Sequence, residues 1–87
     1  MRTAYVNGEF IAEQDAKVSI FDRAFLFADG VYEVTSVLNG KLVDFDNHIK
    51  RLKRSMKELD FGPTINEEEF LTFHRKLVEL NEIKEGI

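Results

Sequence analysis

Residues 28–34 read Ala-Asp-Gly-Val-Tyr-Glu-Val, and they lead through an Asn-Gly pair at positions 39–40 to the run His-Ile-Lys-Arg-Leu at positions 48–52. The Asp-Gly pair is a turn signal, and the alternation that follows it is typical of a β-strand over residues 30–38. Asn-Gly tolerates the positive φ of a type I′ hairpin turn, so residues 41–43 are predicted to return antiparallel. The stretch therefore predicts a turn, a hairpin and a basic helix in direct succession.

Side chains of the predicted strand lie alternately on two faces. The first face carries Tyr32, Val34, Ser36 and Leu38. The second face carries Val31, Glu33, Thr35 and Val37. Both faces hold apolar side chains, as expected for a sheet with another layer on each side.

The chain before this stretch predicts another hairpin and a loop. Tyr5-Val6 and Phe10-Ile11 flank an Asn-Gly turn at residues 7–8, which indicates two short strands. Residues 18–26 carry large apolar side chains without a clean period, and we interpret them as a packed loop with at most one helical turn. The pair Asp22-Arg23 within it is interpreted as a surface ion pair or as a brace for the loop.

The chain after the stretch predicts two amphipathic helices. In the first helix, Asp46 is expected to be the N-cap, and Gly62-Pro63 is expected to end the helix. Its apolar stripe consists of Ile49, Leu52, Met56 and Leu59. Its outer face consists of Lys50, Lys53, Arg54 and Lys57.

The second helix has a capping-box pattern, with Asn66 as the N-cap and Glu69 three residues later. Its apolar stripe consists of Phe70, Phe73, Leu77 and Leu80, with Ile65 placed as a hydrophobic staple. The helix is predicted to end near Ile83. The final residues 85–87 are interpreted as a helix terminator followed by the first residue of another strand.

Hairpins followed by helices indicate an α+β fold, with an antiparallel sheet and the helices on one side of it. The 87 residues are expected to form one small domain, residues 1–87. A core of this size is only marginally stable without a partner surface. The apolar fraction of 44% is nevertheless typical of a folded globular chain.

Composition argues against several classes of partner. A formal net charge of −4 disfavours a nucleic-acid backbone as partner. Without cysteine, and with two histidines that lack a ligand-like spacing, no metal site is expected. No apolar run is long enough to span a bilayer and no secretory leader is visible, so we expect no membrane partner and a cytoplasmic location.

Arg51 is the first candidate for chemistry, because a guanidinium can bind phosphate through two parallel hydrogen bonds. The plainer interpretation is one more solvated base on a basic helix. Tyr32 shares a strand face with Val34 and Ser36, so the three side chains can line one pocket. An aromatic residue at the rim of a core is the simpler interpretation of Tyr32.

Glu33 lies on the opposite face of the strand, where a carboxylate must be solvated or paired. His48 is the partner we expect for it. The pair is interpreted either as a structural contact or as support that orients the helix carrying Arg51.

Residues 22–52 resemble the signature of the class IV aminotransferases, which are pyridoxal-phosphate enzymes of fold type IV. The points of resemblance are the Asp-Arg pair at 22–23, Asp-Gly-Val-Tyr-Glu at 29–33, the Asn-Gly turn at 39–40 and His-x-x-Arg-Leu at 48–52. Each motif alone is common, but their order and spacing together are specific. The resemblance covers nearly the whole chain and is closest to the D-amino-acid aminotransferase branch.

The resemblance implies that Arg51 binds the phosphate of the pyridoxal 5′-phosphate cofactor. It also implies that Tyr32 helps to hold the substrate carboxylate, with Val34 and Ser36 on the wall of the same pocket. The D-amino-acid branch often has Lys in place of Ser36, and often Gly in place of Ala24 and Ala28, which leaves the exact substrate open.

The same resemblance places the Schiff-base lysine of the family in a larger C-terminal domain. No lysine of this chain matches that motif; the lysines are Lys17, Lys41, Lys50, Lys53, Lys57, Lys76 and Lys84. The chain is therefore expected to be an inactive N-terminal domain.

The implied parent enzyme is a homodimer that transfers the amino group of a D-alanine-like amino acid to a 2-oxo acid such as 2-oxoglutarate. Aminodeoxychorismate lyase and branched-chain aminotransferase of the same fold remain open, as does a free-standing interaction module that uses the Lys-rich helix face. Under the enzyme hypothesis, Arg51 and Tyr32 should converge from separate elements on one anionic adduct.

Overall fold

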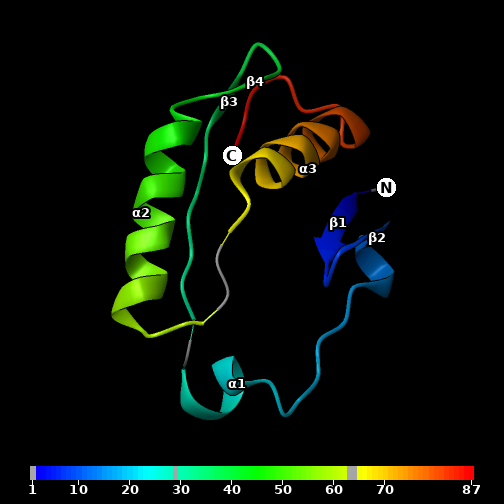
Figure 1. Cartoon of the computed structure of the whole chain (residues 1–87). Coiled ribbons are helices and arrows are strands. Elements are labelled where there is room, and N and C mark those ends of the chain that lie inside the picture. The colour runs from blue at the N-terminus through cyan, green and yellow to red at the C-terminus, as the bar shows by residue number, and fades with distance from the viewer. Residues whose placement is uncertain (1, 29, 63–64) are drawn as a thin grey trace.

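Two antiparallel hairpins and two long helices make up most of the chain (Figure 1). The computed structural model describes residues 2–28, 30–62 and 65–87. Its strands are β1 (Thr3–Val6), β2 (Glu9–Ala12), β3 (Val37–Leu38) and β4 (Lys41–Leu42). Its helices are the 3-10 turn η1 (Glu13–Asp15), α1 (Arg23–Phe27), α2 (Phe45–Glu58) and α3 (Glu67–Leu80). The predicted α+β class is confirmed.

The N-terminal hairpin has the predicted strands and turn. β1 and β2 pair from Thr3 opposite Ala12 to Val6 opposite Glu9. Asn7 and Gly8 have φ values of 49° and 85°, as a type I′ turn requires at both central residues. The hairpin is then attached to α3, because the ring of Tyr5 stacks on that of Phe73 at a centroid distance of 4.2 Å.

The second hairpin is shorter than predicted. Only Val37 and Leu38 pair with β4, although Asn39 and Gly40 form the expected turn with φ values of 51° and 71°. The preceding residues 31–36 keep the predicted alternation, with odd positions half-buried and even positions exposed. Within the described ranges no strand lies beside them, and a segment without a neighbouring strand cannot form a ladder.

The C-terminal residues return to the same hairpin. Gly86 forms an isolated antiparallel bridge with Val37, through Val37 N to Gly86 O at 2.7 Å and Gly86 N to Val37 O at 3.0 Å. Val37 therefore lies between two partners and is only 3% exposed. The prediction that a strand begins at the C-terminal end is supported by this single bridge.

α2 begins two residues earlier than expected, at Phe45. Its N-cap is Asp44 in the left-handed conformation, so the prediction of Asp46 as the N-cap was wrong. The chain has to reverse direction between β4 and the helix, and an Asp tolerates the positive φ that this reversal needs. The carboxylate of Asp44 accepts a hydrogen bond from Asn47 Nδ2 at 2.7 Å, and Asp46 lies in the first turn.

The C-terminus of α2 also differs from the prediction. The helix ends at Glu58, before Gly62, and Pro63 lies outside the described residues. Asp60 has a φ of 56°, and Phe61 N donates to Met56 O at 2.9 Å. This is the Schellman arrangement, here made with Asp in the position that usually holds Gly.

α3 starts as predicted, since Asn66 Oδ1 accepts a hydrogen bond from Glu69 N at 3.1 Å. It ends at Leu80 and not near Ile83, because Glu82 takes a positive φ and Ile83 N closes a second Schellman bond to Val78 O. Asn81, the C-cap, also joins α3 to β1. Its Oδ1 accepts from Thr3 N at 2.7 Å, and its Nδ2 donates to Thr3 O at 2.9 Å.

The core is small. Val37 and Ile49 are the buried hydrophobic residues of the described ranges, and Leu52 and Met56 of the predicted stripe are half-buried. Leu59, the last member of that stripe, is exposed. The chain exposes 7201 Å² of surface, whereas about 5,300 Å² is expected for a folded monomer of its mass.

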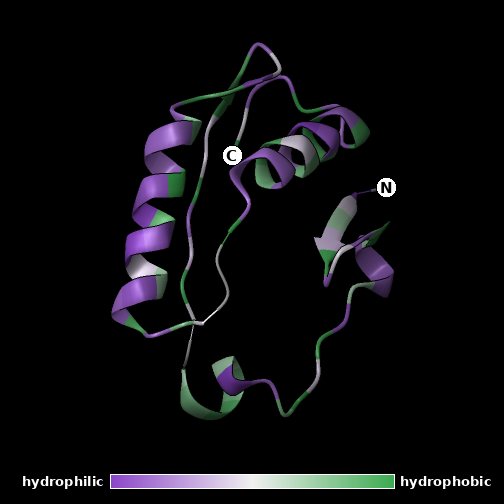
Figure 2. Cartoon of the chain, in the orientation of Figure 1, coloured by the Kyte–Doolittle hydropathy of each residue, from purple (hydrophilic) through white to green (hydrophobic). Residues whose placement is uncertain are grey.

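Residues 18–27 account for much of this excess, so the prediction of a packed loop was wrong. Their large apolar side chains are all more than half exposed: Val18, Ile20, Phe21, Phe25, Leu26 and Phe27. In Figure 2, α1 is drawn mostly in the hydrophobic colour, whereas α2 is drawn mostly in the hydrophilic colour. The helical turn is confirmed: Asp22 Oδ1 caps α1 at Ala24 N, and the Arg23 guanidinium lies 4.9 Å from the centre of the Phe27 ring.

Candidate functional site

The carboxylate of Glu33 is the centre of a cluster that joins residues 31–36 to α2. His48 and Arg51 lie three residues apart on the same face of α2, so both can reach one acceptor. His48 Nδ1 lies 2.8 Å from Glu33 Oε1. Arg51 donates from Nη2 to Oε1 and from Nε to Oε2, each at 2.7 Å.

These hydrogen bonds determine the charge state of the cluster. The donors of Arg51, and then of His48, lower the pKa of Glu33 from 4.5 to about 2. The hydrogen bonds from Arg51 to Glu33 likewise raise the pKa of Arg51. An ionised carboxylate is only an acceptor, so His48 must carry its hydrogen on Nδ1.

The guanidinium of Arg51 keeps an open edge. A guanidinium has five N–H donors, and the bidentate contact with Glu33 uses Nε and one hydrogen of Nη2. Within residues 2–28, 30–62 and 65–87, no side chain binds the two hydrogens of Nη1 or the second hydrogen of Nη2, and these three hydrogens form the outer edge of the guanidinium. The Arg51 side chain is 55% exposed, whereas that of Glu33 is 12% exposed. The arrangement can therefore offer two parallel N–H donors to an anion in solvent.

Tyr32, Val34 and Ser36 lie on the exposed face of the same segment, as the alternation predicted. The side chain of Tyr32 is 84% exposed. Tyr32 also contributes to the raised pKa of Arg51, after the larger effect of Glu33, so the two side chains are within electrostatic range. Among the described residues, no hydrogen bond joins Tyr32 to Arg51.

The structure thus brings together Glu33, His48 and Arg51, and it places Tyr32, Val34 and Ser36 on the exposed side of the segment. The pairing of Glu33 with His48 is confirmed. The direct contact between Glu33 and Arg51 was not predicted. Its signal was present in the sequence, because a residue three positions after His48 on a helix reaches the same partner.

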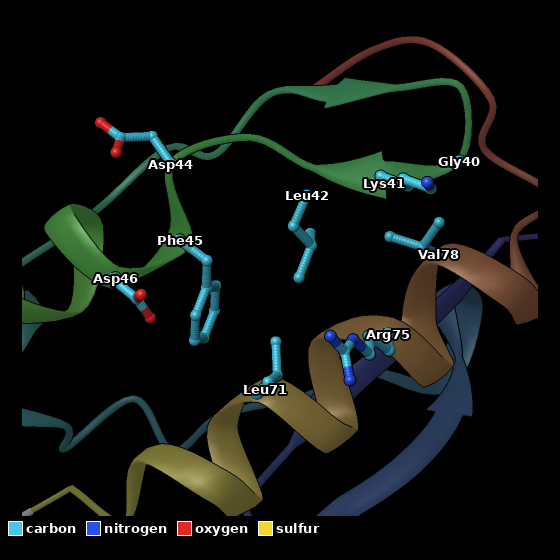
Figure 3. A pocket seen from close by; sticks show the side chains of 9 residues that line it. All are labelled: Gly40, Lys41, Leu42, Asp44, Phe45, Asp46, Leu71, Arg75 and Val78. Carbon is cyan, nitrogen blue, oxygen red and sulfur yellow. The ribbon is translucent and has the colours of Figure 1, made fainter.

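A separate hollow of about 820 Å³ lies between the β3–β4 hairpin, the start of α2 and α3 (Figure 3). Leu42, Phe45 and Leu71 point into it, and Arg75 lies at its edge on α3, whereas Asp44 turns away from it. Neither Arg51 nor Tyr32 lines this hollow. It gives no support to the predicted substrate site.

Features for binding a metal ion or crossing a membrane are missing from the described part of the chain. There, no group of three or more His, Cys, Asp or Glu side chains is arranged to hold a metal ion. Within the same ranges, none of the helices has the length and apolar character needed to cross a bilayer.

The chain has a hairpin, an extended segment and a basic helix in this order, and Arg51 on that helix is hydrogen-bonded to Glu33 of the segment. This order agrees with the resemblance found in the sequence. The sequence profile of the family described as amino-transferase class IV matches residues 30–86. The chain therefore belongs to the class IV aminotransferase family.

Relatives with two different names are similar to this chain. A D-alanine aminotransferase from Staphylococcus aureus (strain MSSA476) is 40% identical over 87 residues, which are all of this chain and 31% of the relative. A D-alanine aminotransferase from Staphylococcus haemolyticus is 41% identical, over 99% of this chain and 30% of the relative. An aminodeoxychorismate lyase from Bacillus subtilis (strain 168) is 42% identical, over 94% of this chain and 28% of the relative. The chain spans about 30% of the length of these curated relatives.

Proposed function

We propose that this chain is the N-terminal small domain of a pyridoxal-phosphate-dependent aminotransferase. The proposed enzyme is cytoplasmic and homodimeric, and it transfers the amino group of a D-alanine-like amino acid to a 2-oxo acid such as 2-oxoglutarate. The D-alanine aminotransferases among the relatives support the choice of substrate. The remaining part of the enzyme would supply the larger catalytic domain.

The open edge of Arg51 is the observation that carries this proposal. Two parallel N–H donors on a permanently charged group fit the geometry of a phosphate, so the donor set is suitable for the cofactor's phosphate. Arg51 would hold the phosphate, and the bound cofactor would act as the electron sink for the substrate's α-carbon.

The exposed face of residues 31–36 would meet the substrate. The hydroxyl of Tyr32 would donate a hydrogen bond to the substrate carboxylate, and Val34 and Ser36 would form the adjoining wall. Glu33 follows Tyr32 directly and is bound to Arg51. The side chains that would bind the substrate and the guanidinium that would bind the cofactor's phosphate would therefore be held together through one segment.

The excess surface supports a larger parent. The difference of about 1,900 Å² from the expected monomer surface is more than the roughly 800 Å² that each partner buries in a standard protein interface, so it is large enough for one or more covering surfaces. The exposed apolar residues 18–27 would be covered by the C-terminal domain or by the second subunit.

The test is to express this chain together with its C-terminal domain and to assay D-alanine with 2-oxoglutarate. We expect transamination by the complete enzyme and none by residues 1–87, because the Schiff-base lysine would lie in the absent domain. Activity of the 87-residue chain alone, or no transamination by the complete enzyme, would contradict the proposal.

Aminodeoxychorismate lyase activity is the second candidate, because one relative carries that name and is equally similar. The same preparation should be tested with aminodeoxychorismate. Turnover of that compound without turnover of D-alanine would establish the lyase instead.

A further inference from the structure

We infer that Glu33 is a positioning residue that selects which edge of the Arg51 guanidinium is presented to a phosphate, and that His48 fixes Glu33 for this role. The inference rests on the proposed function, and it adds a specific geometric task to two residues that do not touch the cofactor themselves. The ligand class is a phosphate monoester.

Glu33 and a phosphate would use different N–H donors of Arg51. Glu33 binds the side edge of Arg51, formed by Nε and Nη2, through two hydrogen bonds of 2.7 Å. A second anion can then make a bidentate contact only at the outer edge, formed by Nη1 and Nη2. Glu33 thereby determines the direction from which a phosphate can approach.

The carboxylate of Glu33 is held by two side chains of α2. A carboxylate held only by Arg51 could rotate together with the guanidinium. The hydrogen bond from His48 Nδ1 to Oε1 ties it to a second point on α2, one turn before Arg51. The Glu33 side chain is largely buried and that of Arg51 is half exposed. The hydrogen bonds to Glu33 therefore hold the side edge of the guanidinium and leave its outer edge in solvent.

Glu33 has two opposing effects on the affinity of Arg51 for phosphate. A carboxylate beside Arg51 partly cancels the positive charge that attracts phosphate. On charge alone, removal of Glu33 should strengthen phosphate binding. Pre-organisation works in the opposite direction, because a free Arg side chain loses its rotamer freedom only when the ligand binds. We expect pre-organisation to dominate, since both hydrogen bonds to Glu33 are short and well formed.

The experiment compares the wild-type complete enzyme with E33Q, E33D and R51A. Equilibrium titration measures the affinity for pyridoxal 5′-phosphate and, as a control, for pyridoxal, which has no phosphate. We expect E33Q to bind pyridoxal 5′-phosphate roughly tenfold more weakly, because a Gln amide can accept only one of the two Arg51 donors. Affinity for pyridoxal should change little.

The E33D variant separates charge from geometry. It keeps the negative charge but shortens the side chain, so it cannot reach both donors. Weakening in E33D as well as in E33Q is expected. Unchanged or tighter binding of pyridoxal 5′-phosphate in E33Q would overturn the inference, and if E33Q fails to fold, unchanged binding in E33D would do so.

Two variants of His48 test its part. In H48N the amide nitrogen stands where Nδ1 stood and can still donate to Glu33, so most of the affinity should be kept. In H48L the donor is lost, and affinity should fall between those of wild type and E33Q. Equal affinities in H48N and H48L would contradict the role of His48.

A spectroscopic readout on the wild-type protein is independent of catalysis. The Nε–H resonance of Arg51 in nitrogen-15 NMR should be protected from exchange and should stay in place when inorganic phosphate is added, while the Nη resonances shift. Displacement of the Nε–H signal by phosphate would show that the side edge is the anion site and would refute the inference.

The experiment distinguishes a failure of the proposed role of Arg51 from a failure of the proposed role of Glu33. If R51A leaves the affinity for pyridoxal 5′-phosphate unchanged, then Arg51 does not hold the cofactor and the proposed function loses its support. If R51A weakens binding but E33Q does not, only the positioning role of Glu33 is wrong.

Discussion

Residues 18–27 and residues 31–37 are both rich in apolar side chains, but they are held in different ways. The first segment leaves its large hydrophobic side chains exposed, and its main support is the short helix α1. The second is anchored at Glu33 by α2 and at Val37 by β4 and Gly86. Residues 31–37 are thus held by contacts within this chain, whereas residues 18–27 expose the apolar surface that the proposed larger enzyme would cover.

The largest loss of stability should follow from a substitution in the buried face of α2, the helix that holds residues 31–37. Ile49 is 4% exposed and lies on the inner face of α2. I49A should lower the free energy of unfolding by about 2–5 kcal/mol, enough to unfold much of so small a domain. Urea unfolding followed by circular dichroism measures this. F25A, on the exposed segment, is the control, and equal losses in both variants would remove the distinction between the two regions.

A smaller effect is expected where α3 is fastened to β1. Asn81 makes two hydrogen bonds to Thr3 and a third to Leu77 O at 2.9 Å. N81A should cost about 1–3 kcal/mol of unfolding free energy, since partly buried backbone groups of Thr3 and Leu77 lose their partner. N47A removes an exposed side-chain contact and should cost less than about 0.5 kcal/mol. A loss in N47A as large as in N81A would contradict this account.

The anchor at Glu33 should also depend on pH. Because the folded-state pKa of Glu33 is about 2 and its ordinary value is 4.5, the clamp stabilises the fold fully above the higher value and is lost as the pH falls toward the lower one. The urea midpoint of the wild type should therefore fall more steeply than that of E33Q across this interval. E13Q, which removes an exposed ion pair with Arg2, is the control and should follow the wild type. If the urea midpoints of wild type and E33Q fell in parallel with pH, the contacts of Glu33 with Arg51 and His48 would not stabilise the fold.

The smallest effect on stability should come from the exposed segment. A double variant with F21S and F25S should change the unfolding free energy by no more than about 0.5 kcal/mol. It should, however, reduce self-association of the 87-residue chain, because those side chains offer the exposed apolar surface. Sedimentation velocity distinguishes the two proteins. A wild-type chain that stays monomeric at high concentration would show that this surface is not adhesive.

Features of the fold that depend on local chemistry were predictable from the sequence. The two Asn-Gly turns, the N-cap at Asn66 and the alternation of residues 31–36 depend on a few neighbouring residues, and all were confirmed. Helix ends were harder. Asp44, Asp60 and Glu82 adopt positive φ values that no Gly marks, so the start of α2 and the ends of α2 and α3 were misplaced.

Features that depend on distant partners were less predictable. The packed loop and the full-length strand over residues 30–38 both require neighbours that the described chain does not supply. At the site, periodicity placed Glu33 on the face opposite Tyr32, and the pairing with His48 followed from that. The bidentate contact with Arg51 requires the distance between the segment and α2, which sequence spacing alone does not provide.

The most direct test of the central claim is a titration of the complete enzyme with pyridoxal 5′-phosphate, for wild type, R51K and R51A. Our account predicts that R51A binds the cofactor roughly a hundredfold more weakly and that R51K recovers only part of this loss, because a Lys ammonium cannot form the paired hydrogen bonds. Equal affinity in all three proteins would show that the outer edge of the Arg51 guanidinium does not bind the cofactor's phosphate.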